Sequence, residues 1–202
     1  PVNAADITIN SLDQYNQLKK DGTLSGGGTG TISKPTSSDD NNKVTVNMNN
    51  DQLIGYNLAA GSGDGNTLIV NSGTFGKEGA NNSSTKSSVY GSADGTIAHN
   101  NTVIINGGTF NQDVYGGEAK GIGNGERVKN NNVYIRGGTV KGWVAGGWLT
   151  SGDGTAIDNH VYIDNNAEVK TVYGGYSCDS TSENTVEITG AAVVSNAYGG
   201  YN

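Results

Sequence analysis

Asparagine, glycine and β-branched residues recur along most of the chain in one pattern. An Asn precedes alternating apolar positions, a glycine-containing bend follows, and in the four most regular copies a Val or Ala stands thirteen residues after the Asn, before Gly-Gly. The copies start at Asn42, Asn66, Asn101, Asn131, Asn159 and Asn184, at intervals of 24 to 35 residues. A repeat of this length, with a fixed part and a variable part, is typical of a solenoid.

Alternation within each copy predicts a strand, because successive side chains of a strand point to opposite faces. One face is always apolar: Val44/Val46, Leu68/Val70, Val103/Ile105, Val133/Ile135, Val161/Ile163 and Val186/Ile188. The position between them varies: Thr45, Ile69, Ile104, Tyr134, Tyr162 and Glu187. A constant column beside a variable one favours parallel strands stacked in register about 4.8 Å apart. We therefore predict an all-β fold, a right-handed parallel β-helix (β-solenoid) of about six coils.

The rest of each copy predicts two further strands. Gly-Gly at 107–108 and 137–138 supplies a bend with positive φ. A second strand follows at Phe75, Phe110, Val140 and Val193, whereas Glu168 takes this position in the fifth copy and suggests a bulge before Val169. Val-Tyr-Gly-Gly forms a third strand and its turn, with Leu53-Ile54-Gly55 as its first, looser copy. The leading asparagines Asn42, Asn66, Asn101, Asn131, Asn159 and Asn184 are predicted to form a hydrogen-bonded ladder between coils.

Residues 1–41 lack the repeat and are expected to form an N-terminal cap, followed by one continuous solenoid domain at 42–202. Ile7 and Ile9 predict a short strand. Ser11 is a candidate N-cap for a short helix with Leu12, Tyr15 and Leu18 on one face. Such a cap would cover the open end of the first coil.

Composition narrows the classes of function. Only 33% of the 202 residues are hydrophobic, and the mean hydropathy is −0.47, so a single round core is not expected. The net charge of −7 disfavours binding to nucleic acid. Cys178 is the only cysteine, so no disulfide forms within the chain. No apolar run approaches the roughly 18 residues of a membrane-spanning helix.

Candidate catalytic and metal-binding residues are scattered. Gly61–Leu68 is similar to calcium-binding glycine-rich repeats, but the Asp-Gly pairs occur singly, which favours ordinary turns and leaves calcium as the alternative. His99 and His160 lack the spacing of metal ligands. We predict no metal, cofactor or catalytic residue, with a polysaccharide-cleaving β-helix enzyme as the alternative function. Its candidate acids would be Asp113, Glu118, Glu126, Glu168 and Glu187.

Aromatic residues give the most specific candidate site. Tyr134 and Tyr162 share an outward position in adjacent copies, and Trp143 and Trp148 flank the one copy that has Ala145 in place of Tyr. These four aromatics would form an exposed patch that grips a sugar or a partner protein. Alternatively, the two tryptophans only fill the space left by Ala145. A structural ladder is expected from Tyr90, Tyr115, Tyr173 and Tyr198.

The variable segments are expected to emerge at one edge of the stack, where recognition could be built. They comprise residues 76–88, 92–96, 118–130, 148–155 and 177–183.

The repeats Asn-Thr-Val-Ile-Ile-Asn-Gly-Gly-Thr-Phe (101–110) and Val-Tyr-Gly-Gly-Tyr-Ser (172–177) resemble those in the passenger regions of autotransporter-type (type V secretion) adhesins of Gram-negative bacteria. The resemblance covers about 42–202. It implies an extracellular, outer-membrane-attached adhesin or stalk that binds a host-cell or bacterial surface protein or a glycan. It also implies a cleaved signal peptide and a C-terminal translocator as the only membrane contact. Because the repeats stop at Tyr201-Asn202, we expect a monomeric fragment of a longer protein.

Overall fold

A computed structural model describes residues 3–202, which are nearly all β, with one helix, α1 (Leu12–Lys20). The first face holds β1 (Asp6–Ile9), β3 (Lys43–Leu53), β5 (Thr67–Phe75), β8 (Thr102–Ile105), β12 (Asn132–Ile135), β15 (His160–Ile163) and β18 (Thr185–Ile188). The second face holds β9 (Thr109–Phe110), the ends of β3 and β5, and the beginnings of β13 (Thr139–Leu149), β16 (Glu168–Tyr176) and β19 (Val193–Tyr201). The third face holds β2 (Ile32–Ser33), β4 (Asn57–Gly61), β6 (Val89–Gly95), β10 (Val114–Ala119) and the remainder of β13, β16 and β19. No helix in this described part of the chain is long and apolar enough to cross a membrane.

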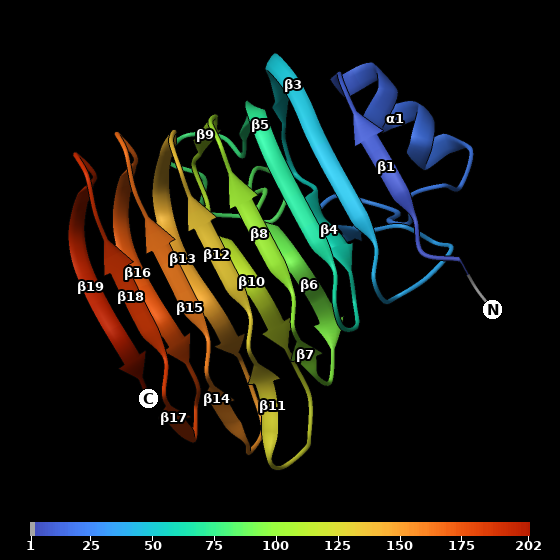
Figure 1. Ribbon diagram of the computed structural model, residues 1–202. Helices are drawn as coiled ribbons and strands as arrows, with labels where there is room; N and C mark the ends of the chain where they lie inside the picture. The colour runs from blue at the N-terminus through green and yellow to red at the C-terminus, as the bar shows by residue number, and fades with distance from the viewer. Residues whose placement is uncertain (1–2) are drawn as a thin grey trace.

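The strands of successive coils pair in parallel and in register, so the chain forms a β-solenoid of about six turns, as predicted. Figure 1 shows the near strands β8, β12 and β15 pointing up and the far strands β6 and β10 pointing down, while the coils advance from right to left. This winding is right-handed. The N-terminal strand and helix lie at one end of the stack (Figure 1).

The interior is the apolar column that alternation predicted. Val103, Ile105, Val133 and Ile135 are completely buried, and the rings of Phe75 and Phe110 stack at 4.8 Å between centroids. On the last described coil Val186 is only partly buried and Ile188 is 43% exposed, because no further described coil covers them. Coil-on-coil contact, rather than a central core, therefore buries the apolar residues.

The six leading asparagines form a ladder along the solenoid. The backbone N–H of each of the first five donates to the side-chain oxygen of the asparagine in the next coil, at 2.9 to 3.1 Å, and Asn184 accepts the last of these bonds. Ala5 extends the ladder into the cap, since its N–H donates to Asn42 Oδ1 at 2.7 Å. All but Asn184 are buried, so these bonds satisfy polar groups that water cannot reach.

The Gly-Gly of each Val-Tyr-Gly-Gly is not a turn, which corrects the sequence prediction. β10 continues through Gly116 and Gly117 to Ala119. A Cβ on Gly117 would lie 2.7 Å from Asn131 Oδ1, and one on Gly147 would lie 2.6 Å from the Asn159 amide. These glycines make room for the ladder. By contrast, Gly108 has the positive φ of +104° predicted for the bend.

Three register predictions were also wrong. Val194, not Val193, aligns with Val169, and Val193 is 62% exposed. The extra residue of the fifth copy lies in a turn at Asn165, with φ of +55°, before the strand rather than as a bulge within it. Leu53 aligns with Phe75 on the second face, so the third-face strand of the first copy begins near Leu58.

The cap continues the first and third faces. β1 pairs with β3, which sets Ile7 beside Val44, and β2 pairs with β4. Ser11 caps α1 by accepting from the Gln14 N–H at 3.1 Å. Tyr15 is fully buried and bonded to Ser33 at 2.6 Å, and burial raises its pKa to about 12. The helix thus covers the first coil, as its apolar stripe predicted.

Part of the variable segments forms a small additional sheet, here called the edge sheet, which alternation did not predict. Its strands are β7 (Ala98–His99), β11 (Glu126–Lys129), β14 (Thr155–Ile157) and β17 (Ser180–Ser182). It has its own small core of Ala119, Val128, Leu149 and Ala156. The loops beside it project at one edge of the stack, at the bottom of Figure 1.

Candidate functional site

The structure divides the four predicted site residues between two faces. Tyr134 and Tyr162 stack on the first face, with ring centroids 4.9 Å apart. Trp143 and Trp148 lie on β13 and contact each other on the third face at 5.3 Å. The four therefore do not form one patch, because each coil turns between β12 and the later part of β13.

The third face instead carries a larger cluster, here called the aromatic stripe. It consists of Tyr90, Tyr115, Trp143, Trp148, Tyr173, Tyr176, Tyr198 and Tyr201. Neighbouring rings lie 4.0 to 6.1 Å apart between centroids, the closest being Trp148 and Tyr176. The stripe extends through five consecutive coils, from β6 to β19.

Parallel register creates the stripe from two columns. In one, Tyr90, Tyr115, Ala145, Tyr173 and Tyr198 are successive partners. In the other, Glu118, Trp148, Tyr176 and Tyr201 are successive partners. Trp148 contacts both Tyr115 and Tyr173 and so bridges the space that Ala145 leaves. The alternative gap-filling interpretation therefore describes Trp148, while Trp143 beside it is 43% exposed.

Sequence reasoning missed Tyr176 and Tyr201. The signal was present, because an aromatic residue directly follows Gly-Gly in three successive copies, at positions 148, 176 and 201. A turn at Gly-Gly hides this signal, because the direction of a side chain cannot be inferred beyond a turn. Since the strand continues through both glycines, the following residue takes a fixed outward position.

Exposure differs among the rings of the stripe. Tyr90, Tyr115 and Trp148 are buried beneath their neighbours, whereas Tyr198 is 40% and Tyr201 47% exposed. Burial raises the pKa of the Tyr115 phenol well above its usual value, and the Asp113 carboxylate adds to this shift. The Tyr115 side chain accordingly remains a neutral hydroxyl group at neutral pH, able to donate and accept hydrogen bonds.

One buried carboxylate borders the stripe. Glu118 is 5% exposed, and its Oε2 lies 3.4 Å from Lys120 Nζ, which also lies 3.0 Å from Asp94. Burial raises the pKa of Glu118, partly opposed by Lys120. The structure thus gathers Asp94 and Glu118, which sequence spacing did not.

The Glu118 and Asp94 carboxylates share the Lys120 ammonium group, whereas the other candidate acids lie apart from them. Asp113 precedes β10 and stands five residues before Glu118, about 16 Å along an extended backbone. Asp94 is occupied by Lys120. Glu126 pairs with Lys129 at the edge sheet, Glu168 lies on the second face and Glu187 on the first. The acids therefore remain dispersed, apart from Asp94 and Glu118.

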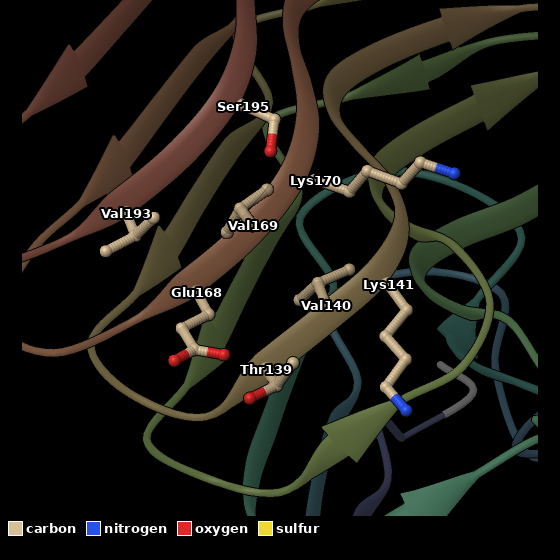
Figure 2. Close-up of a pocket in the computed structure, with 8 residues that line it drawn as sticks. All are labelled: Thr139, Val140, Lys141, Glu168, Val169, Lys170, Val193 and Ser195. Atoms are coloured by element: carbon tan, nitrogen blue, oxygen red, sulfur yellow. The ribbon is translucent and has the colours of Figure 1, made fainter.

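Among the hollows away from the stripe, two lie on the second and first faces. Figure 2 shows one of about 350 Å³ on the second face, in which the ammonium groups of Lys141 and Lys170 point away from the Glu168 carboxylate. The other, of about 260 Å³, lies on the first face beside the Tyr134–Tyr162 pair, where Arg136 lies 5.5 Å from the centre of the Tyr134 ring. Neither brings together groups for a defined chemical step.

Both histidines make hydrogen bonds within the fold. His99 Nε2 lies 2.8 Å from the carbonyl oxygen of Glu126, and His160 lies between Thr185 and Asp158. Within residues 3–202 no group of three or more His, Cys, Asp or Glu side chains is arranged to hold a metal ion. Cys178 is exposed and unpaired with any other cysteine.

The fold and the stripe define this chain as a parallel β-solenoid with an aromatic outer surface. Comparison with protein-family models, with curated proteins and with solved structures finds no match.

Proposed function

We propose that this chain is a non-catalytic binding module of a bacterial cell surface, which holds a neutral polysaccharide on its aromatic stripe. The observation that carries the proposal is the continuity of the stripe across five coils. The resemblance to autotransporter adhesins supports an extracellular, surface-attached location, with a host-cell or bacterial glycan as the partner. The solenoid supplies a stiff support, because every coil is fixed to its neighbours by backbone and asparagine hydrogen bonds.

A linear glycan suits the shape of the stripe. Ring-to-ring contacts follow the solenoid axis, across the strands, so the surface is long and narrow. Sugar rings have apolar faces and polar edges, and they match aromatic faces flanked by hydroxyl groups. The buried rings of the stripe pack against small residues, Ala59, Ala93 and Ala145.

Charge favours a neutral partner. The chain carries a net charge of −7, and Glu118 and Asp113 border the stripe. Polymers rich in carboxylate or sulfate would be repelled at low ionic strength. Neutral polysaccharides would not be repelled.

The experiment is a binding assay of the purified chain against a panel of neutral and acidic polysaccharides. The test variant is Trp143→Ala with Tyr198→Ala, since both side chains are at least 40% exposed and support little of the fold. We expect affinity for a neutral polysaccharide to fall by about 30-fold, the loss typical of a binding hot spot of roughly 2 kcal/mol.

The matched control is Tyr134→Ala with Tyr162→Ala, which removes a stacked aromatic pair from the first face. It should bind as the unchanged chain does. Equal losses in both double variants, or no binding to any polysaccharide in the panel, would overturn the proposal. Release of reducing ends during the assay would favour the polysaccharide-cleaving alternative.

A further inference from the structure

A polar hollow lies at the N-terminal end of the aromatic stripe. Its volume is about 340 Å³, at the lower end of the range for small-molecule pockets. It is lined by Gly30, Asn57, Asn81, Asn82, Ser83, Lys86, Ser88, Tyr90 and Asp113. Tyr90 is the first ring of the stripe, so the hollow and the stripe share a side chain.

The wall of the hollow is the insertion at residues 76–88, which packs against the outside of the solenoid. Backbone N–H groups of Gly55 and Leu58 donate to the carbonyls of Lys86 and Ser88, at 3.1 and 3.0 Å. Ser88 in turn donates its N–H to Asn57 Oδ1 at 2.9 Å. Gly30 closes the other side, because a Cβ there would meet Ser83. The wall of the hollow is therefore fixed to the solenoid by hydrogen bonds, and the aromatic stripe stops at this wall.

Polar atoms of several kinds reach the hollow. The side-chain oxygen of Asn57 accepts from the Ser88 N–H, and its amide nitrogen makes no hydrogen bond to another of the described residues. Lys86 is exposed and forms no ion pair among the residues that the structure describes. Asp113 accepts from the Trp143 N–H at 2.8 Å through Oδ1. The Asp113 carboxylate is also close enough to the Tyr115 hydroxyl for a hydrogen bond.

Asp113 also connects the hollow to the exposed part of the stripe. Val114 pairs with Val144, so Asp113 and Trp143 are neighbours on adjacent coils. A chain of sugar rings that runs from Tyr198 over Trp143 would reach Asp113 next. Beyond it lies the wall formed by the insertion.

We infer that this hollow is a subsite for the terminal sugar of a neutral glycan whose preceding rings lie on the stripe. The inference rests on the proposed function and adds the recognition of a chain end. Lys86 and Asn81 donate to hydroxyl groups of the terminal sugar, Asp113 lies beside them, and the Tyr90 ring borders its apolar face. The opposite charges of Lys86 and Asp113 cancel, which suits a neutral hexose better than an acidic sugar.

Free monosaccharides test the hollow independently of the stripe. Saturation-transfer NMR of the full chain would use millimolar glucose, galactose, mannose and N-acetylglucosamine. We expect signal from at least one of them, and an affinity about tenfold weaker in the Asn81→Ala, Lys86→Met double variant, as loss of a charge-assisted hydrogen bond predicts. Both side chains are exposed, so the fold should be unchanged.

Two variants separate the hollow from the stripe. Lys77→Met removes an exposed lysine of the same insertion that does not line the hollow, and Tyr198→Ala removes the far end of the stripe. Both should keep monosaccharide binding. No signal in the unchanged chain, or equal binding by the Asn81→Ala, Lys86→Met variant, would overturn the subsite. Loss of polysaccharide binding in Trp143→Ala with Tyr198→Ala reports only on the proposed function.

Discussion

At the scale of single residues, the position before each ladder asparagine has an unusual backbone. Asn41, Gly65, Asn100, Asn130, Asp158 and Glu183 all have positive φ, between 52° and 71°. Asn and Asp adopt this left-handed conformation more readily than other side chains, whereas a residue such as Glu has no such advantage. The chain reverses there so that the asparagine side chain can enter the ladder.

Glu183→Gly should therefore stabilise the last coil. Relief of left-handed strain is worth about 1–2 kcal/mol, from which the greater flexibility of glycine when unfolded subtracts about 0.5–1 kcal/mol. We expect a net gain of about 0.5–1 kcal/mol, measured as slower hydrogen exchange of the amides of residues 185–188. Glu187→Gly, in β18, is the control and should speed exchange, since glycine weakens a strand interior.

The direction of a side chain can be predicted from sequence at some positions and not at others. Alternation identified Val103 and Val133 as inward because burial depends directly on side-chain polarity. It could not place Trp148, since its direction depends on whether Gly146-Gly147 turns or continues. Nor could it distinguish Val193 from Val194, because one extra turn residue reverses which side chain points inward.

Glu118 gives a residue-scale prediction about pH. Its pKa is raised in the folded protein, so between the unfolded value of about 4.3 and the raised value the folded state binds more protons. Stability from this group is therefore complete below that window and is lost as the pH rises through it. Glu118→Gln should melt close to the unchanged chain at pH 4 and become relatively more stable towards pH 7.

Thermal melting of both proteins from pH 4 to pH 8 measures this difference. Glu126→Gln is the control, because its partner Lys129 lies on an exposed surface where ion pairs contribute about 0–1 kcal/mol. A difference between the Glu118 variant and the unchanged chain that stays constant with pH would contradict the assignment.

At the scale of elements, a buried arginine fixes the loops beside the edge sheet. Arg127 on β11 is 2% exposed. Its guanidinium donates to five backbone carbonyls, those of Thr96, Lys120, Gly121, Ser151 and Asp153, at 2.6 to 3.1 Å. These acceptors belong to the loops of three successive coils. No sequence pattern identified this residue, because its partners are main-chain atoms brought together only by stacking.

Arg127→Lys should destabilise the edge sheet by about 3 kcal/mol. Lysine keeps the charge, but one ammonium group cannot span five carbonyls, and each hydrogen bond to a charged group is worth about 1.5–3 kcal/mol. Limited proteolysis should then cut within 120–125 and 150–154 more rapidly. Arg136→Lys, on the exposed first face, should leave the cleavage rate unchanged; rapid cleavage in both variants would exclude a specific role for Arg127.

At the scale of the whole molecule, stability comes from contacts between adjacent coils, so the same substitution should have different effects along the axis. Val133 and Val186 occupy one column, but Val133 is completely buried between two coils and Val186 is only partly buried. Loss of two buried methyl groups with a cavity costs about 2–3 kcal/mol, and much less where solvent already reaches the site.

Val133→Ala should therefore lower the free energy of unfolding in urea by about 2–3 kcal/mol, and Val186→Ala by less than about 1 kcal/mol. The pair is its own control, because residue type, strand position and register are identical. In a stack, the Val186→Ala effect should also be confined to exchange of the last coil, whereas Val133→Ala should accelerate exchange on both sides of β12. Equal losses would mean that all coils unfold as one cooperative unit, rather than through separate contacts between neighbouring coils.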